Sequence, residues 1–184
     1  ETTVPRRTPA AISSLSDVVG IAAGTNHSLA LDWYGQVWSW GLVNDGQLGC
    51  SGNPWLPGLV AGLPQIVAIA AGYAHSLALG ADGSVWAWGA NESGQLGDGS
   101  RTARLTPVQV ASLGAIGAID GGSEHSLALD VNGAVWAWGG NTFGQLGNAT
   151  ATYRTAPAKV AGLPGVMAIA AGGGHNAALA FDGR

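Results

Sequence analysis

Four histidines have the residue type and the regular spacing that could serve metal binding or acid–base chemistry. They stand at His27, His75, His125 and His175, each at the same place in a recurring sequence pattern. A metal or catalytic site needs several different groups gathered at one place, whereas these are one position copied four times. We therefore predict a structural role, in which each ring hydrogen-bonds the backbone of its own turn.

Tryptophans form the second set with a chemical use, because indole rings can stack on nucleic-acid bases or on sugars. They occur as pairs two residues apart: Trp38 and Trp40, Trp86 and Trp88, Trp136 and Trp138. Residues two apart leave a strand on the same face. Because the pairs recur at one position, we predict that they fill the space between neighbouring sheets, against small residues such as Ala68, Ala70 and Ala71.

The remaining composition excludes several classes of function. The net charge of −4 and the single lysine, Lys159, argue against nucleic-acid binding, which needs clustered Lys and Arg. The pair Arg6 and Arg7 is interpreted as a solvated terminus. Cys50 is the only cysteine, so neither an internal disulfide nor a cysteine-based metal site can form. No apolar run reaches the roughly 18–20 residues of a membrane span.

No constellation of catalytic residues stands out beyond the repeat. The Gly-Gln-Leu-Gly turns lack the Lys-Ser/Thr of a phosphate-binding loop, and they recur three times. We predict that the protein is not an enzyme and that it uses no cofactor and no metal ion.

A repeated unit must position these residues. Its copies span Gly24–Gly49, Gly72–Gly97 and Gly122–Gly147, and a fourth, partial copy starts at Gly172. The first copy is two residues shorter than the others between Gly49 and Pro57, and the rest of the repeat keeps its spacing. We therefore predict a loop at this place, because loops absorb such deletions and packed elements do not.

Each copy predicts four short strands. In the second copy these are Val67–Gly72, His75–Leu79, Val85–Trp88 and an outer strand near Pro107–Val110, with its proline at the start. The first of these strands has equivalents at Val18–Gly24, Ile116–Gly122 and Val166–Gly172. Four strands per roughly 50 residues are typical of a propeller blade.

A tight turn is expected between the second and third strands. Asp82-Gly83, Asn132-Gly133 and Asp182-Gly183 predict a two-residue hairpin turn in which both residues take a positive φ. The first copy has Tyr34-Gly35 instead, which is less favourable for a bulky side chain.

Three motifs in fixed order carry a family resemblance. G-x-x-H-S-L-A-L, D/N-G-x-V-W-A-W-G and N-x-x-G-Q-L-G together resemble the repeat of the regulator of chromosome condensation family, from about Pro9 onward. The resemblance implies an all-β protein: a seven-bladed β-propeller whose blades have four antiparallel strands. With three complete repeats and part of a fourth, this chain would form an incomplete propeller, roughly half of the ring.

The expected organisation is an N-terminal extension at residues 1–8 and a propeller segment at 9–184. The repeats would run at about 9–56, 57–106, 107–156 and, in part, 157–184. With neither an initiating Met nor a signal-peptide pattern, the chain is expected to be an excised segment. The Lys-poor surface favours an extracellular or cell-surface protein.

An open arc of blades would leave apolar faces uncovered at its two ends, and such patches invite association. Three ways of covering them stay open: a second copy, the rest of a longer chain, or another partner. The piece Pro9–Ile12 would supply an outer strand to a blade other than the first.

Function is expected where the repeats differ, on the propeller face that carries the turns after strands one and three. The candidate protein-binding residues there are Tyr73, Glu92, Glu124, Phe143 and, on a neighbouring loop, Trp55. Aromatic residues ringed by polar groups suit protein recognition. The alternative is a solvated loop set without a partner.

The resemblance implies several activities, since the family includes a guanine-nucleotide exchange factor for a small nuclear GTPase, a bacterial β-lactamase inhibitor and a plant ultraviolet photoreceptor. Photoreception is disfavoured, because the Trp-Arg-His of that receptor is replaced by unrelated pairs, such as Tyr73-Ala74 and Ser123-Glu124. The leading hypothesis is a non-enzymatic scaffold that binds a protein partner, with self-assembly into a homo-oligomer as a second class. The alternative is an exchange factor-like regulator of a small GTPase, whose acidic catalytic residues match no position here.

Overall fold

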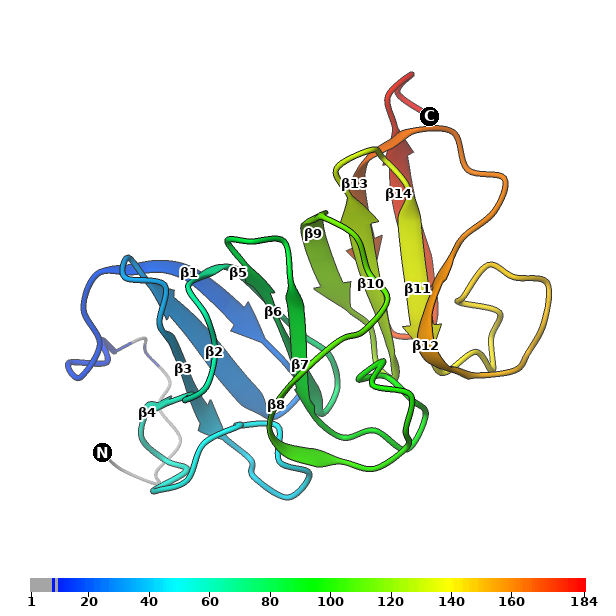
Figure 1. The fold of residues 1–184 in the computed structure, drawn as a ribbon. Helices are drawn as coiled ribbons and strands as arrows, with labels where there is room; N and C mark the ends of the chain where they lie inside the picture. The colour runs from blue at the N-terminus through cyan, green and yellow to red at the C-terminus, as the bar shows by residue number, and fades with distance from the viewer. Residues whose placement is uncertain (1–7, 9) are drawn as a thin grey trace.

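The computed structural model describes residue 8 and residues 10–184. Four antiparallel β-sheets lie side by side in chain order and fan out from the N-terminal to the C-terminal part of the chain (Figure 1). The described part of the chain contains no helix that could span a membrane. Arg6, Arg7 and Pro9, which the sequence singled out, lie outside the described residues.

The first three sheets have four strands each, in up-and-down order. The first comprises β1 (Val18–Ala23), β2 (His27–Asp32), β3 (Val37–Gly41) and β4 (Gly58–Leu59). The second comprises β5 (Ile66–Ala71), β6 (His75–Gly80), β7 (Val85–Gly89) and β8 (Arg104–Gln109). The third comprises β9 (Ile116–Gly121), β10 (His125–Asp130), β11 (Val135–Gly139) and β12 (Arg154–Lys159). The fourth comprises β13 (Val166–Ala171) and β14 (Asn176–Ala180).

This arrangement confirms the predicted all-β fold of four-stranded propeller blades in an incomplete ring. The inner three strands lie within a residue of their expected positions. The outer strands differ, because β8 begins at Arg104 and Pro107 lies inside the strand rather than at its start. Proline is compatible with this place, because β8 is the edge strand of its sheet. In the first sheet the outer strand shrinks to the two residues of β4.

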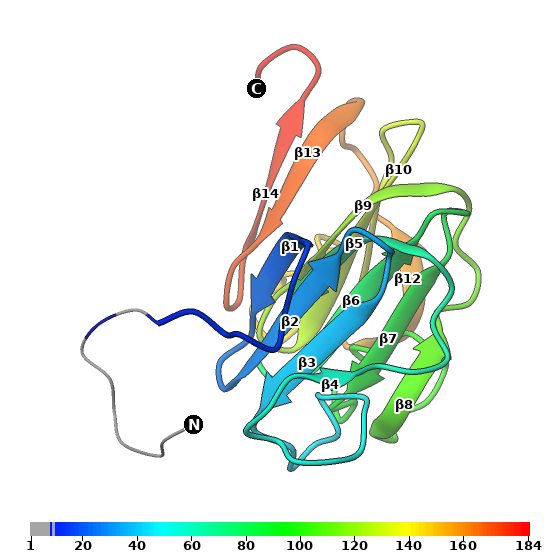
Figure 2. The ribbon, with the colours of Figure 1, turned by 90° about the vertical axis from the view of Figure 1, so that its left-hand side faces the viewer.

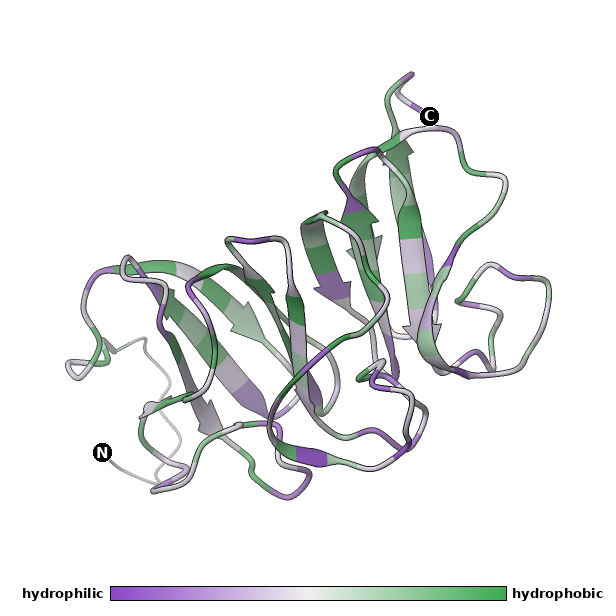
Figure 3. Cartoon of the chain, viewed as in Figure 1, coloured by the Kyte–Doolittle hydropathy of each residue, from purple (hydrophilic) through white to green (hydrophobic). Residues whose placement is uncertain are grey.

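Alternation along the strands builds the core between the sheets. Leu29, Leu31 and Val37 project from one face of the first sheet and pack against Trp88 of the second sheet. Leu77, Leu79 and Val85 repeat this contact against Trp138 of the third sheet. Hydrophobic residues accordingly concentrate in the strands, and polar residues in the turns and loops (Figure 3). In the second and third sheets one tryptophan of each pair, Trp88 or Trp138, is fully buried between sheets, whereas Trp86 and Trp136 are only partly buried.

The hairpin turns differ from the prediction. Gly83 has a φ of +81° and Gly35 a φ of +79°, but neither Asp82 nor Tyr34 has a positive φ. The amide of Gly83 donates to the carbonyl of Gly80, and the amide of Gly80 to the carbonyl of Ser84, which closes a three-residue loop with glycine as its last residue. The two-residue turn was the wrong prediction, and Tyr34 is unstrained because only the glycine position requires a positive φ.

The outer strand expected from Pro9–Ile12 is not formed by its described part, since residues 10–12 have no strand structure. In Figure 2 the dark-blue stretch between residue 10 and β1 lies outside the sheets. Residues 10–12 therefore complete none of the described sheets.

One edge of the sheets carries the structures that the sequence proposed for binding. The turns at residues 24–26, 72–74, 122–124 and 172–174 lie at this edge, together with the long loops 42–57, 90–103 and 140–153 (Figure 1). We call this surface the loop face. The turns between β2 and β3, β6 and β7, and β10 and β11 lie at the opposite edge.

The two end sheets leave apolar surface open. Ile21 and Trp38 lie on the face of the first sheet that points away from the second, on either side of the buried Ala30. Ile21 is 80% exposed, whereas the equivalent Ile69 and Ile119 are partly buried between sheets. At the other end of the arc Leu179 of β14 is 43% exposed, so apolar surface is open at both ends.

Candidate protein-binding face

Backbone hydrogen bonds join the turns of the loop face from sheet to sheet. The amide of Thr25 donates to the carbonyl of Tyr73 at 3.4 Å, and the amide of Tyr73 to the carbonyl of Gly122 at 3.3 Å. The amide of Ser123 donates to the carbonyl of Gly173 at 3.2 Å. Together the turns line a hollow of about 300 Å³, in which Tyr73 is the one aromatic residue among small neighbours.

The repeated histidines join neighbouring sheets. The Nε2 atom of His27 lies 2.9 Å from Oγ of Ser76, and that of His75 lies 3.0 Å from Oγ of Ser126. His125 makes the equivalent bond to Oδ1 of Asn176 at 2.7 Å. The prediction of a bond to the backbone of the same turn was wrong, because each of these rings bonds to a side chain of the next sheet. The Nδ1 atoms of these three rings have no partner among the described residues.

Burial keeps these rings neutral. Removal from water disfavours the charged imidazolium and lowers the pKa of His27 to about 4. Burial, aided by the nearby His27 and His125, lowers the pKa of His75 to about 3. Burial also lowers the pKa of His125, although Asn176 acts in the opposite direction. A neutral ring that joins two sheets supports the structural interpretation.

A glutamine carbonyl completes each junction between sheets. The carbonyl of Gln47 accepts hydrogen bonds from Oγ of Ser76 and Nε1 of Trp88, both at 2.9 Å. In the next junction the carbonyl of Gln95 accepts from Ser126 and Trp138, at 2.8 and 2.9 Å. Each Gly-Gln-Leu-Gly turn therefore fixes the loop face to the following sheet.

Two buried asparagines organise the long loops, and the sequence did not identify them as functional. The side-chain amide of Asn91 donates to Asp98, Ser100 and Thr102, while its Oδ1 accepts from the amide of Leu96. Asn141 repeats the pattern in the third sheet. Val43 stands at this position in the first repeat, so loop 42–57 lacks this bonding centre. The asparagine of the N-x-x-G-Q-L-G motif was the available signal.

The loops of the second and third sheets also contact each other. Oγ of Ser93 donates to Oε2 of Glu124 at 3.0 Å, which brings Glu124 beside the loop that carries Glu92. The guanidinium of Arg101 donates to the carbonyl of Glu92 and lies 4.5 Å from the ring centre of Tyr153. Arg101 and Tyr153 belong to the loop face, but the sequence gave no repeat signal for either.

The five predicted binding residues are all exposed on the loop face, but they do not form one pocket. Tyr73 lies at the central hollow and is 55% exposed. Glu92 and Glu124 lie at the contact between the second and third sheets. Phe143 is 80% exposed beside Gly174, and Trp55 is 72% exposed on loop 42–57. The arrangement is a broad surface with separated aromatic side chains, which suits a protein partner better than a small molecule.

Within residue 8 and residues 10–184, no group of three or more His, Cys, Asp or Glu side chains could hold a metal ion. His27, His75 and His125 serve the junctions between sheets instead.

Sheets of four antiparallel strands, each carrying the same His, Trp and Gly-Gln-Leu-Gly junction to its neighbour, define a β-propeller repeat protein. The chain belongs to the RCC1-like domain family, whose model matches residues 1–184. No curated protein matched the chain in a sequence comparison.

Solved structures of the same architecture resemble this chain. Prp20p from Saccharomyces cerevisiae is 25% identical with a TM-score of 0.78, over 86% of this chain and 42% of Prp20p. The yeast RCC1 (Prp20) bound to Kap60 is 26% identical with a TM-score of 0.76, over 88% of this chain and 41% of that one. Human WBSCR16, at 21% identity and a TM-score of 0.62 over 89% of this chain and 57% of that one, shares the fold. The chain thus spans about two fifths of the length of the Prp20 proteins.

Proposed function

We propose that this chain is a protein-binding scaffold that holds its partner against the loop face. The observation that carries the proposal is that the loop face combines exposed aromatic side chains with loops that are hydrogen-bonded to the sheets beneath them. Tyr73 and Trp55 are held out to solvent on this face. Rigid aromatic side chains contribute large contact area at a small cost in conformational entropy, and they are enriched in binding hot spots.

The bonding beneath the face supports this proposal. The glutamine carbonyls, the buried Asn91 and Asn141, and the Ser93–Glu124 contact fix the loops before a partner arrives. Preorganised loops lose less conformational entropy on binding, so more of the contact energy appears as affinity. The acidic Glu92 and Glu124 favour a partner that presents basic or hydrogen-bond donor groups beside an apolar patch.

The structural relatives support the same class of function. The structure of Prp20p is described with its binding to Gsp1p and histones, and another Prp20 structure contains Kap60. These partners belong to those proteins. For this chain, they support protein recognition as the function of the fold and leave the partner to experiment.

The test compares two double variants that remove the same side-chain types from opposite edges. The first is Tyr73→Ala with Trp55→Ala on the loop face. The matched control is Tyr34→Ala with Trp33→Ala, in the exposed turn between β2 and β3. Proteins retained by the unaltered chain are identified by mass spectrometry, and each purified partner is then titrated by calorimetry.

We expect the loop-face variant to lose at least tenfold in affinity for the partner, about 1.4 kcal/mol or more, and the control to bind as the unaltered chain does. Equal loss in both variants, or loss in the control alone, would contradict the proposal. Circular dichroism of both variants establishes that the exposed substitutions leave the fold intact.

A second candidate is an exchange factor-like regulator of a small GTPase, favoured by the similarity to Prp20p. Its test is the release of fluorescent GDP from a small nuclear GTPase. Acceleration by the unaltered chain would support it. An unchanged release rate at saturating chain concentration would leave the scaffold as the function.

A further inference from the structure

The loops that follow the third strand of the second and third sheets enclose a polar centre. In the second sheet the side-chain amide of Asn91 donates to Asp98 at 3.1 Å, and Arg104 of β8 forms an ion pair of 2.6 Å with the same carboxylate. In the third sheet Asn141 donates to Asn148 at 3.0 Å. The inside of both loops is therefore occupied by hydrogen-bonded polar side chains.

The equivalent loop of the first sheet, residues 42–57, has apolar residues in place of this centre. Val43, Cys50 and Pro54 stand where the second repeat has its asparagine, aspartate and arginine. Valine and proline side chains have no hydrogen-bonding atoms, and the thiol of Cys50 lies 3.2 Å from the hydroxyl of Ser39. The polar groups that occupy the loop centre in the other two sheets are therefore missing from loop 42–57.

A pocket of about 220 Å³ lies in this loop instead. Leu48 is only 2% exposed, whereas Val43 is 47% exposed, so the pocket leads from the surface to a buried leucine. Its walls all belong to loop 42–57 and to Gly58 of β4, so no other sheet forms it. An apolar cavity of roughly 150 Å³ in another protein takes up benzene, which makes this pocket large enough for a phenylalanine side chain. Its apolar lining residues are Val43, Leu48, Pro54, Leu56 and Pro57.

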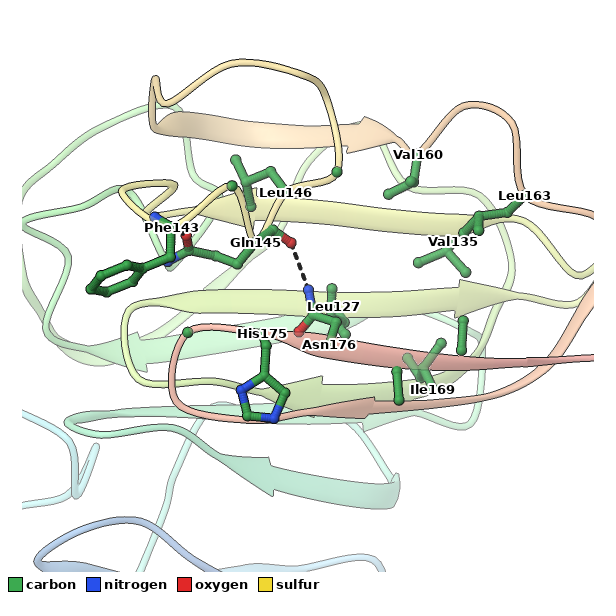
Figure 4. Close-up of a pocket in the computed structure, with 15 residues that line it drawn as sticks. Leu127, Val135, Phe143, Gln145, Leu146, Val160, Leu163, Ile169, His175 and Asn176 are labelled. Carbon is green, nitrogen blue, oxygen red and sulfur yellow. Dashed lines mark hydrogen bonds between the residues drawn. The ribbon is translucent and has the colours of Figure 1, made fainter. Parts of the chain in front are cut away.

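The Gly-Gln-Leu-Gly turn fixes one wall of the pocket. Leu48 belongs to this turn, and the carbonyl of the neighbouring Gln47 accepts a hydrogen bond from Oγ of Ser76 in the next sheet. The corresponding carbonyl in the third sheet, that of Gln145, accepts from Nδ2 of Asn176 at 2.6 Å (Figure 4). The wall that carries Leu48 is therefore tied to a packed sheet rather than to the loop alone.

Hydrogen bonds within the loop fix a second wall. The amide of Gly41, the last residue of β3, donates to the carbonyl of Pro54 at 2.7 Å. Oδ1 of Asn53 accepts from the amide of Trp55 at 3.0 Å, and the carbonyl of Asn53 accepts from the amide of Leu56 at 3.1 Å. Because both walls are held, the pocket is preformed, which lowers the entropy cost of filling it.

The charge of this loop indicates what kind of segment can approach the pocket. Asp45 is the only charged residue of loop 42–57, and it is exposed two residues after the lining Val43. Among the described residues the ion pairs are Arg104–Asp98 and Arg184–Asp182, so Asp45 has no cationic partner there. Charge complementarity therefore favours a lysine or arginine beside the apolar side chain that enters the pocket.

We propose that the pocket of loop 42–57 binds one phenylalanine-sized apolar side chain of the protein that docks on the loop face, with a lysine or arginine of the same segment beside Asp45. This rests on the loop-face function proposed above and specifies the chemistry of its partner. Trp55, which is 72% exposed and stands between the lining residues Pro54 and Leu56, adds apolar contact area next to the pocket. The partner segment is thus an apolar residue flanked by basic ones.

Cys50 reports directly on the pocket, because it is the only cysteine of the chain and lines the pocket. Its alkylation by N-ethylmaleimide is followed by mass spectrometry with and without a blocked peptide, Gly-Lys-Phe-Lys-Gly. We expect saturating peptide to slow the reaction at least tenfold. The peptide with alanine in place of phenylalanine should give no protection, and the peptide with glutamate in place of both lysines should need at least a tenfold higher concentration. Equal protection by the phenylalanine and alanine peptides, or protection by neither, would overturn the proposal.

Substitutions in the loop locate the bound peptide. Val43→Asn with Cys50→Asp introduces the polar pair of the second repeat and should weaken binding of the fluorescein-labelled peptide at least tenfold, as measured by fluorescence anisotropy. Val131→Asn is the matched control, because Val131 is 67% exposed in the turn between β10 and β11 at the opposite edge, and it should leave binding unchanged. Circular dichroism establishes that both variants keep the fold. Unchanged affinity of the double variant would place the peptide elsewhere and overturn the proposal.

The partner captured on the loop face separates this proposal from the function on which it rests. If Tyr73→Ala with Trp55→Ala weakens the binding of that partner and Val43→Asn with Cys50→Asp does not, the loop-face function stands and the pocket proposal fails. If only the pocket variant weakens the binding of the partner, the pocket proposal is supported and Tyr73 and Trp55 are not the anchors of the loop face. Loss of affinity in both variants supports both proposals.

Discussion

The ring of His75 reaches Ser126, 51 residues further along the chain, at 3.0 Å between Nε2 and Oγ. Both side chains are fully buried, and the same serine hydroxyl donates to the carbonyl of Gln95. The hydroxyl of Ser126, in the third sheet, thus bonds both to the histidine of the second sheet and to the loop that follows the third strand of that sheet.

Ser126→Ala should therefore destabilise the chain by about 1–3 kcal/mol, because it leaves the buried Nε2 atom of His75 without its partner. Ser28→Ala is the matched control. Ser28 has the same repeat position but lies half-buried on the open face of the first sheet, so we expect a much smaller loss. Chemical denaturation followed by circular dichroism measures both, and equal losses would refute the role of the junction.

Trp88→Ala should cost about 3–5 kcal/mol of unfolding free energy, through lost burial and the cavity it leaves. Trp40→Ala tests the same substitution without a covering sheet, because Trp40 is half-buried on the open face. We expect a clearly smaller loss there. A Trp88→Ala variant whose thermal midpoint matches that of the unaltered chain would show that the indole does not hold the sheets together.

Acid should destabilise the chain in a window set by the buried histidines. Their pKa values are lowered in the fold, to about 4 for His27 and about 3 for His75, so the unfolded chain binds protons first as the pH falls. Stability is fully present above the ordinary histidine pKa of about 6.5 and declines below it, by about 1.4 kcal/mol per pH unit for each ring that stays neutral. Denaturation at pH 7, 6 and 5 measures the slope.

His75→Gln should reduce that slope, because one titrating group is removed while a hydrogen-bonding side chain remains. If the free energy of unfolding did not change between pH 7 and pH 5, the histidine rings would not be buried and neutral in the folded chain.

Asn91→Ala should loosen loop 90–103 and cost about 1–3 kcal/mol, because the buried amide of Leu96 loses its acceptor. Limited proteolysis should show earlier cleavage within this loop. Asn44→Ala, at an exposed position of loop 42–57, is the control and should leave both stability and cleavage unchanged. If Asn91→Ala resists protease as the unaltered chain does, the asparagine does not organise the loop.

Sequence periodicity predicted the blades well, because local patterns such as Val-Trp-Ala-Trp specify both a strand and the face it buries. It could not predict that His75 bonds to Ser126, since that depends on how two sheets meet rather than on either sheet alone. The turn at Asp82-Gly83 was predicted one residue too short, because an Asx-Gly pair occurs in both two-residue and three-residue hairpin loops. Which of the two loops forms depends on the hydrogen bonds between the flanking strand residues.

The candidate site was predicted less completely. Tyr73, Trp55 and Phe143 were found as departures from the repeat, and all are exposed. Arg101 and Tyr153 were missed because their contact joins two loops of different repeats, and no spacing within one repeat reveals it. Asn91 was visible in the motif, but its burial and bonding depend on the path of the loop that folds around it.

The junction built from histidine, serine, tryptophan and a glutamine carbonyl has an evolutionary consequence. Because successive sheets meet through the same contacts, an unequal crossover between two copies would add or remove one whole blade and still leave every internal junction matched. The number of blades can therefore change in a single genetic event, and the exposed residues on the loop face can differ from copy to copy without altering these junctions.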